Sequence, residues 1–249
     1  MAGHSKFANI KHRKERQDQA RGKVFSKIAK EITMSVKQGG GPDPAANIRL
    51  SAALDRAKAA NMPKDNIERA IKRATGEIPG VSYEEITYEG YGPDGVAVML
   101  NVITDNKNRA AAEIRQLFDQ SGGSLGGSVA WMFDRKGVVT ISKDKLTSDP
   151  EDFMLEAMDW GAEDLEDEGE VIQLYCDPGQ TSALLEGIQA AGIEPDESIV
   201  TMVPQNTVKL EGKAAERIVK FYQSLDENED VQDVYANFEV PDEVFEAMA

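Results

Sequence analysis

The sequence predicts a multidomain protein of the α and α+β classes, with an N-terminal three-helix bundle followed by two ferredoxin-like α+β domains, one inserted in the other. Apolar residues recur at helical spacing up to about residue 75, and short strand-like runs take over after Pro79. From residue 131 the expected elements follow in the order strand, helix, strand, strand, helix, strand, which is the order of a ferredoxin-like unit.

The first helix is expected from about Gln17 onward, after a short N-terminal arm. One of its faces is apolar, with Val24, Phe25, Ile28, Ile32 and Val36 at helical spacing. The opposite face gathers a row of cations, namely Arg16, Lys23, Lys27, Lys30 and Lys37. Residues 1–16 include few apolar side chains and are expected to form a mobile arm that becomes ordered on a partner.

Two further helices are expected to complete the bundle. Asp43, in the loop GGGPDP, is expected to cap a second helix that ends near residue 60 and buries Ile48. Pro63 is expected to open a third helix, and Gly76 is expected to end it. The positive surface of the bundle is extended by the cations of these two helices, which are Arg49, Arg56, Lys58, Lys64, Arg69, Lys72 and Arg73.

The remaining chain reads as two α/β domains. Residues 82–91 and 95–103 are expected to form strands joined at the turn signal GPDG. Near the C-terminus, TVKL, a helix over residues 213–225 and VQDVYANF supply a further strand, helix and strand. A linear string of three α/β units would leave both end units with too few strands to cover their helices, so we expect these two segments to form one domain. The predicted domains are residues 1–78, residues 79–130 together with 205–249, and the inserted residues 131–204.

Positive and negative charges are segregated along the chain. Residues 1–75 contain 17 of the 28 lysines and arginines and 7 of the 44 acidic residues, a net charge of +10. The rest of the chain contains the other 11 and 37, a net charge of −26. The row of cations on the first helix has an alternative explanation, since a charged face can serve only to keep a surface helix solvated. The asymmetry of the whole chain favours a basic segment that binds a polyanion.

Most classes of catalytic or cofactor site are not indicated. The glycine runs 39–41 and 122–127 lack the Lys-Ser/Thr pair of a phosphate-binding loop. The acidic residues between 163 and 170 lack the spacing of a calcium loop and are expected to form a solvated turn. Cys176, the only cysteine, lies in an apolar run and is expected to be a small buried side chain. We therefore expect no enzyme, no metal and no cofactor, with a metal-dependent nuclease as the alternative class.

No segment of the sequence is expected to reach a membrane. The apolar runs all fall short of 18 residues, and no apolar segment follows the basic N-terminus as it would in a secretory signal. A single cysteine suits a reducing compartment. We therefore expect a cytoplasmic protein with no membrane partner.

The motif TDNKNR is a second candidate for anion binding. Asp105 or Asn106 is expected to cap the helix that begins there, which is the structural explanation for the motif. Lys107 and Arg109 lie in the first turn, where an exposed helix N-terminus and two cations would also suit an anion.

In combination, the sequence motifs resemble the YebC family. They are MAGHSK, ANIKHRK, RGKVFSKIAKEI, GGGPDP, ANMPKDNIERAIKRATG, YEGYGPDGVAV, TDNKNRAAAEIRQLF, GGSLGGSVAWMF and DVQDVYANFE, and they cover residues 1–239. The resemblance implies a cytoplasmic protein with a helical N-terminal domain and two α/β domains. Bacterial members are described as probable transcriptional regulators, and mitochondrial relatives as translational activators of cytochrome c oxidase. The motif match places nucleic-acid contacts at His4, Lys6, Lys11, His12, Arg13 and Lys14, with Arg21, Lys23 and Lys27 behind them.

The predicted function is a non-enzymatic regulator of gene expression that binds DNA through its basic N-terminal domain. The alternative is a translation factor that binds ribosomal or transfer RNA on the ribosome. In either case the acidic α/β domains offer a surface to a basic protein partner. The predicted nucleic-acid contacts are His4, Lys6, Lys11, His12, Arg13, Lys14, Arg16, Arg21, Lys23, Lys27, Lys30, Arg49 and Arg56.

Overall fold

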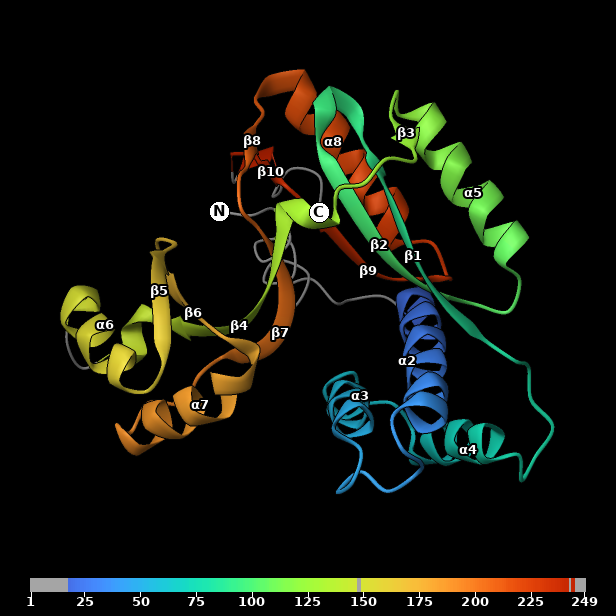
Figure 1. The fold of residues 1–249 in the computed structure, drawn as a ribbon, viewed down its shortest axis with the longest axis horizontal. Helices are drawn as coiled ribbons and strands as arrows, with labels where there is room; N and C mark the ends of the chain where they lie inside the picture. Colours follow the sequence, from blue (N-terminus) through green and yellow to red (C-terminus); the bar gives the residue numbers. More distant parts are fainter. Residues whose placement is uncertain (1–17, 147–148, 242, 245–249) are drawn as a thin grey trace. The chain divides into compact units, whose positions relative to one another are not determined.

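The computed structural model describes residues 18–146, 149–241 and 243–244, with side chains from residue 22 onward (Figure 1). It confirms the predicted multidomain α+β class with a helical N-terminal region. Trp131–Thr207 form one compact unit, and the described residues before and after them belong to a second unit. The finer division into three domains stays a prediction, and each unit is described by itself below.

The larger unit begins with three helices. They are α2 (Asp18–Gln38), α3 (Ile48–Ala59) and α4 (Lys64–Thr75). Their apolar faces meet in a core around Ile32, Leu50 and Ala70, each at most 2% exposed. Gly76 ends α4 in the left-handed conformation with a φ of 81°, which a glycine adopts without strain. The predicted bundle and the predicted end of its third helix are confirmed.

The start of α3 differs from the prediction. Asp43 accepts a hydrogen bond from the backbone of Ala45 and closes a local turn instead of capping the helix. Asn47 is the cap, since its side-chain oxygen accepts from the N–H of Leu50 at 3.0 Å. The Asn47 amide also donates to two carbonyl oxygens at the end of α2 and in the following loop, which delays the helix. Ile48 therefore falls in the first turn and is 88% exposed, so its predicted burial is wrong.

The larger unit also contains a four-stranded antiparallel sheet with the strand order β3-β1-β2-β9. Its elements are β1 (Glu84–Tyr91), β2 (Ala97–Thr104), α5 (Lys107–Gln120), β3 (Ser124–Leu125), α8 (Gly212–Asp226) and β9 (Val231–Ala236). The helices α5 and α8 share one apolar core with β2 and β9. In that core the rings of Phe118 and Phe221 meet edge to face, 4.9 Å apart. The C-terminal segment thus completes a sheet that begins about 130 residues earlier, since Val98 pairs with Ala236.

The edges of this sheet differ from the prediction that TVKL supplies one of its strands. Instead β8 (Val208–Lys209) pairs in parallel with β10 (Phe238–Glu239), separately from the sheet. The edge beside β1 is occupied by β3, from the glycine-rich loop after α5. Gly90 permits this pairing because a Cβ atom there would lie 2.5 Å from the carbonyl oxygen of Ser124.

The smaller unit has the predicted ferredoxin-like order of elements. They are β4 (Phe133–Ser142), α6 (Pro150–Asp159), β5 (Ala162–Asp167), β6 (Val171–Cys176), α7 (Thr181–Ala190) and β7 (Glu197–Pro204). The strands form an antiparallel sheet in the order β5-β6-β4-β7, and α6 and α7 pack on it around Val139, Phe153 and Leu174. Cys176 is fully buried in this core, as predicted.

Candidate nucleic-acid interface

Most of the predicted N-terminal contacts lie outside the described residues. These are His4, Lys6, Lys11, His12, Arg13, Lys14 and Arg16, together with the side chain of Arg21. Their role in binding stays a prediction. The described part of the candidate interface begins with Lys23, which is exposed on the first half of α2.

Lys27 and Lys30 show that the cations of α2 do not form one exposed row. The Nζ atom of Lys30 lies 2.6 Å from a carboxylate oxygen of Asp230 and also donates to a backbone carbonyl oxygen beside it. Lys27 donates to the carbonyl oxygen of Asp226 and lies 3.9 Å from its carboxylate. The two lysine side chains are only 15% and 11% exposed. This face of α2 therefore packs against the acidic segment between α8 and β9, which the sequence analysis did not foresee.

Asp230 is the centre of this contact. Its carboxylate accepts hydrogen bonds from Lys30, from the hydroxyl of Thr104 at 2.9 Å and from Arg109 at 2.9 Å, and its side chain is 4% exposed. Burial alone would raise the pKa of Asp230. The hydrogen bonds from Lys30, Arg109 and Thr104 outweigh that effect and hold the pKa below its ordinary value. The carboxylate is therefore charged, and it forms ion pairs with one lysine and one arginine.

Arg49 and Arg56, on α3, are also engaged by carboxylates. Arg49 holds Glu85 of β1 through two parallel hydrogen bonds of 2.6 and 2.9 Å, a geometry that adds strength and direction. Arg56 lies 3.2 Å from Glu31 and 3.9 Å from Asp233 of β9. Burial raises the pKa of Glu31, and the guanidinium of Arg56 opposes this shift. Both arginines thus face the sheet of their own unit in this structure.

The TDNKNR motif is explained by helix capping. The side chain of Asn106 accepts from the N–H of Arg109 at 3.1 Å, which confirms a predicted cap. The guanidinium of Arg109 lies 2.7 Å from Asp105 and 2.9 Å from Asp230, and its hydrogen bonds with Asp230 and Asp105 raise its pKa. Arg109 is therefore held by two carboxylates in this structure, and its role in an anion site stays a prediction. Lys107 is exposed, and its predicted role stays untested.

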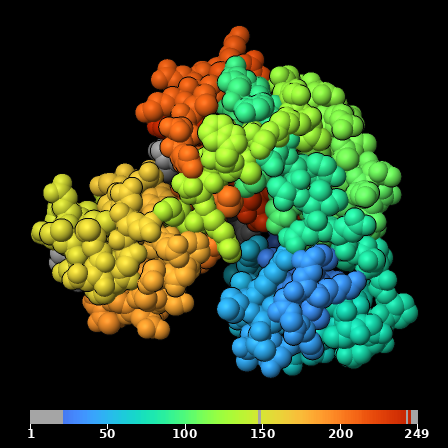
Figure 2. Space-filling view, in the orientation of Figure 1, coloured from blue at the N-terminus to red at the C-terminus, as the bar shows by residue number. Residues whose placement is uncertain are grey.

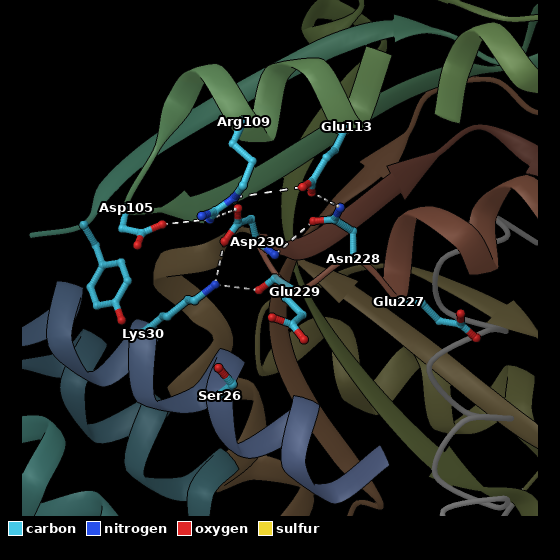
Figure 3. A pocket seen from close by; sticks show the side chains of 10 residues that line it. Ser26, Lys30, Asp105, Arg109, Glu113, Glu227, Asn228, Glu229 and Asp230 are labelled. Carbon is cyan, nitrogen blue, oxygen red and sulfur yellow. Dashed lines mark hydrogen bonds and ion pairs between the residues drawn. The ribbon is translucent and has the colours of Figure 1, made fainter. Parts of the chain in front are cut away.

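A cavity of about 600 Å³ opens beside these ion pairs (Figure 3). Figure 3 shows Lys30 reaching up from α2 and Arg109 reaching down from α5 toward Asp230. The lining residues are Ser26, Lys30, Tyr83, Asp105, Arg109, Glu113, Glu227, Asn228, Glu229 and Asp230. Five of these are carboxylates and two are cations, both of which already contact Asp230. The cavity is therefore acidic and does not suit a phosphate.

The helix α4 presents a further group of exposed cations. Arg69, Lys72 and Arg73 are exposed, and among the described residues none of them forms an ion pair with a carboxylate. At 100° per residue they fall within an arc of about 100°, opposite the half-buried Ile67 and Ile71. The sequence shows that Arg69 is followed by cations three and four residues later. It does not show that these cations are exposed while others of α2 and α3 are paired with carboxylates. We call these three exposed side chains the α4 basic face (Arg69, Lys72 and Arg73).

The acidic residues of the smaller unit do not form a metal centre. Within the part of the chain that the structure describes, no group of three or more histidine, cysteine or acidic side chains could hold a metal ion. The acidic hairpin between β5 and β6 instead binds lysines of the same unit, such as Lys143 to Asp167. Trp131–Thr207 contain 18 acidic and 4 basic residues, a net charge of −14, and three of those four basic residues form ion pairs. This unit therefore repels polyanions.

Among residues 18–146, 149–241 and 243–244, every helix is too short or too polar to cross a bilayer.

The similarity of this chain to known proteins extends over its whole length. The TACO1/YebC protein N-terminal domain matches residues 5–77, and the TACO1/YebC second and third domain matches residues 83–238. A probable transcriptional regulatory protein of Desulforapulum autotrophicum is 50% identical over 250 residues and covers 100% of both chains. Another from Thermotoga maritima is 51% identical over 248 residues, covering 99% of this chain and 97% of the relative.

A solved structure has a similar fold. It is the crystal structure of a conserved hypothetical protein from Aquifex aeolicus, with a TM-score of 0.78 and 41% sequence identity. The match covers 94% of this chain and 96% of that one.

Proposed function

Because this chain belongs to the TACO1/YebC family, we propose that it is a cytoplasmic, non-enzymatic regulator of gene expression that binds DNA through its basic N-terminal domain. Relatives at about half identity are named probable transcriptional regulatory proteins, which supports a regulatory role. The observation that carries the proposal is the charge of residues 1–75, +10 in a chain of −16, together with a basic face on α4 that forms no ion pair with a carboxylate of the described residues.

The proposed binding mode is electrostatic docking on the phosphate backbone. Lysines and arginines that neutralise phosphates release condensed counterions, so affinity falls steeply with salt. The contact surface consists of the N-terminal arm, Lys23 and the α4 basic face, whereas Lys27 and Lys30 contribute little while they are bound to carboxylates. The acidic smaller unit keeps the rest of the molecule off the polyanion. The sequence shows no recognition-helix signature with a base-reading Asn or Gln, so the binding is expected to be independent of sequence.

The decisive experiment is a titration of the full chain with a fluorescent DNA duplex at several salt concentrations. If six to eight cations contact phosphates, affinity should fall by roughly 10³ to 10⁴ between 50 and 200 mM salt. Replacing Lys11, Arg13 and Lys14 together by alanine should weaken binding to every sequence and reduce the salt slope by about three units. An affinity that stays constant across this salt range would contradict the proposal.

A role in translation is the second candidate, and one observation favours it. The net charge of −14 on Trp131–Thr207 suits a contact with basic proteins such as those of the ribosome. In that case the basic domain would bind ribosomal or transfer RNA instead of DNA. Sedimentation of a cell extract through a sucrose gradient, with and without ribonuclease, separates the two. Co-sedimentation with ribosomes that ribonuclease abolishes would favour translation, and co-sedimentation with DNA alone would favour transcription.

A further inference from the structure

Ion pairs connect the bundle α2–α4 with the sheet and the α8–β9 segment of the same unit. They join Lys27 with Asp226, Lys30 with Asp230, Arg49 with Glu85 and Arg56 with Asp233. We call this set the ionic seam. In the space-filling view the blue surface of the bundle lies beside the teal and green surface of the chain that follows it (Figure 2).

The exposure of the side chains in the ionic seam increases from its centre to its edges. The Lys30–Asp230 pair is nearly buried, with side chains 11% and 4% exposed, whereas Arg49 and Arg56 are 35% and 56% exposed. The cavity of about 600 Å³ lies against the central pair and gives solvent and salt ions access to it. Exposed ion pairs contribute little free energy and weaken as salt rises, and a buried pair loses much of its attraction to desolvation. A contact of this kind is easier to open than an apolar core.

All four cations of the ionic seam are among those that the sequence predicts to bind phosphates. The ammonium of Lys30 is held by a carboxylate and a backbone carbonyl oxygen, and its side chain is only 11% exposed, so it offers little to a phosphate in this state. The carboxylates of Glu85, Asp226, Asp230 and Asp233 therefore compete with a polyanion for the charge of these cations.

We propose that the ionic seam is an autoinhibitory latch, in which carboxylates of the sheet domain cover four phosphate-binding cations of the bundle until a nucleic acid displaces them. The proposal rests on the proposed function for the identity of the ligand, a nucleic-acid backbone. The closed state binds through the arm, Lys23 and the α4 basic face alone. In the open state Lys27, Lys30, Arg49 and Arg56 are added to the contact, so the protein binds more tightly and with a steeper dependence on salt.

Opening can be measured on the full chain without nucleic acid. Brief acetylation of lysine amines, read by mass spectrometry, compares Lys27 and Lys30 with Lys23 and Lys37, which are exposed on the same helix. At low salt Lys27 and Lys30 should react about tenfold more slowly than the two reference lysines. This protection should fall at 0.5 M salt and in an Asp226→Asn/Asp230→Asn variant, which keeps the backbone carbonyl oxygens that both lysines contact but loses the carboxylates. Protection that is unchanged under both conditions would overturn the latch. Because Asp230 is buried, the Asp226→Asn single variant tests the same point in a chain whose fold is less perturbed, and it should lower the protection of Lys27 while Lys30 stays protected.

Binding to a DNA duplex then tests inhibition. Asp226→Asn/Asp230→Asn should steepen the salt slope by about 1.8, so that the affinity lost between 50 and 200 mM salt grows about 12-fold. The matched control is Asp119→Asn/Glu216→Gln, which removes the same charge from exposed positions on α5 and α8 and should leave the slope unchanged. Equal slopes in the two variants would overturn the latch and leave the proposed function standing. No binding by the wild type or by either variant would refute the proposed function itself.

Discussion

The α4 basic face allows a quantitative test of where the phosphates bind. Replacing Arg69, Lys72 and Arg73 together by alanine removes three exposed cations, none of which holds a carboxylate among the described residues. Because the three side chains point into solvent and alanine favours helix, the free energy of unfolding should change by less than about 0.5 kcal/mol. Any change in binding can then be attributed to charge and contact.

The expected magnitude follows from counterion release. Each phosphate contact contributes about 0.9 to the salt slope on duplex DNA, so three lost contacts lower the slope by about 2.7. Between 50 and 200 mM salt, a fourfold change, the ratio of wild-type to variant affinity should therefore fall by about 40-fold. Fluorescence anisotropy with one duplex at five or six salt concentrations measures this directly.

A matched variant separates local contact from overall charge. Replacing Arg115, Lys213 and Lys220 by alanine removes the same charge from exposed positions on α5 and α8. Its salt slope should stay within about 0.5 of the wild type, because charges that touch no phosphate release no counterions. Parallel salt plots for the wild type and both variants would refute the assignment of α4 to the interface.

Two further predictions concern stability. Gly187→Ala should destabilise Trp131–Thr207 by about 1–3 kcal/mol in urea denaturation, because a Cβ atom there would lie 2.2 Å from the Trp160 ring. Gly22→Ala is the control on α2: the space around it is open, so the substitution should stabilise the helix by about 0.5–1 kcal/mol. The pKa of Asp230 in the folded protein is below the ordinary value of 3.8, so the carboxylate contributes its full stabilisation above about pH 4. This stabilisation is lost as the pH falls through the pKa of the folded protein. Between about pH 4 and pH 2, the free energy of unfolding of Asp230→Asn should therefore fall less than that of the wild type.

Sequence patterns predicted those parts of the fold that depend on local interactions. The apolar spacing of α2 and the glycine at the end of α4 act over one or two helical turns, and both predictions are confirmed. The order of the elements from β4 to β7 was enough to predict a ferredoxin-like sheet, because few sheet topologies are compatible with that order. The predicted start of α3 was wrong because Asp43 and Asn47 are both good capping residues. Only Asn47 also donates to carbonyl oxygens at the end of α2 and in the loop after it.

The candidate site was harder to predict because its decisive contacts are distant in the sequence. Lys30 and Asp230 are 200 residues apart, and neither position has a local pattern that indicates the other. Counting charges therefore placed Lys27, Lys30 and the α4 basic face in one class, although the structure divides them into cations held by carboxylates and cations open to solvent. This division changes the meaning of the acidic part of the chain. Its carboxylates repel polyanions from one unit, and in the other they occupy the same cations that a polyanion would need. The number of lysines and arginines in a segment is thus only an upper limit on its phosphate contacts, and the measured salt slope reports how many of them bind phosphate.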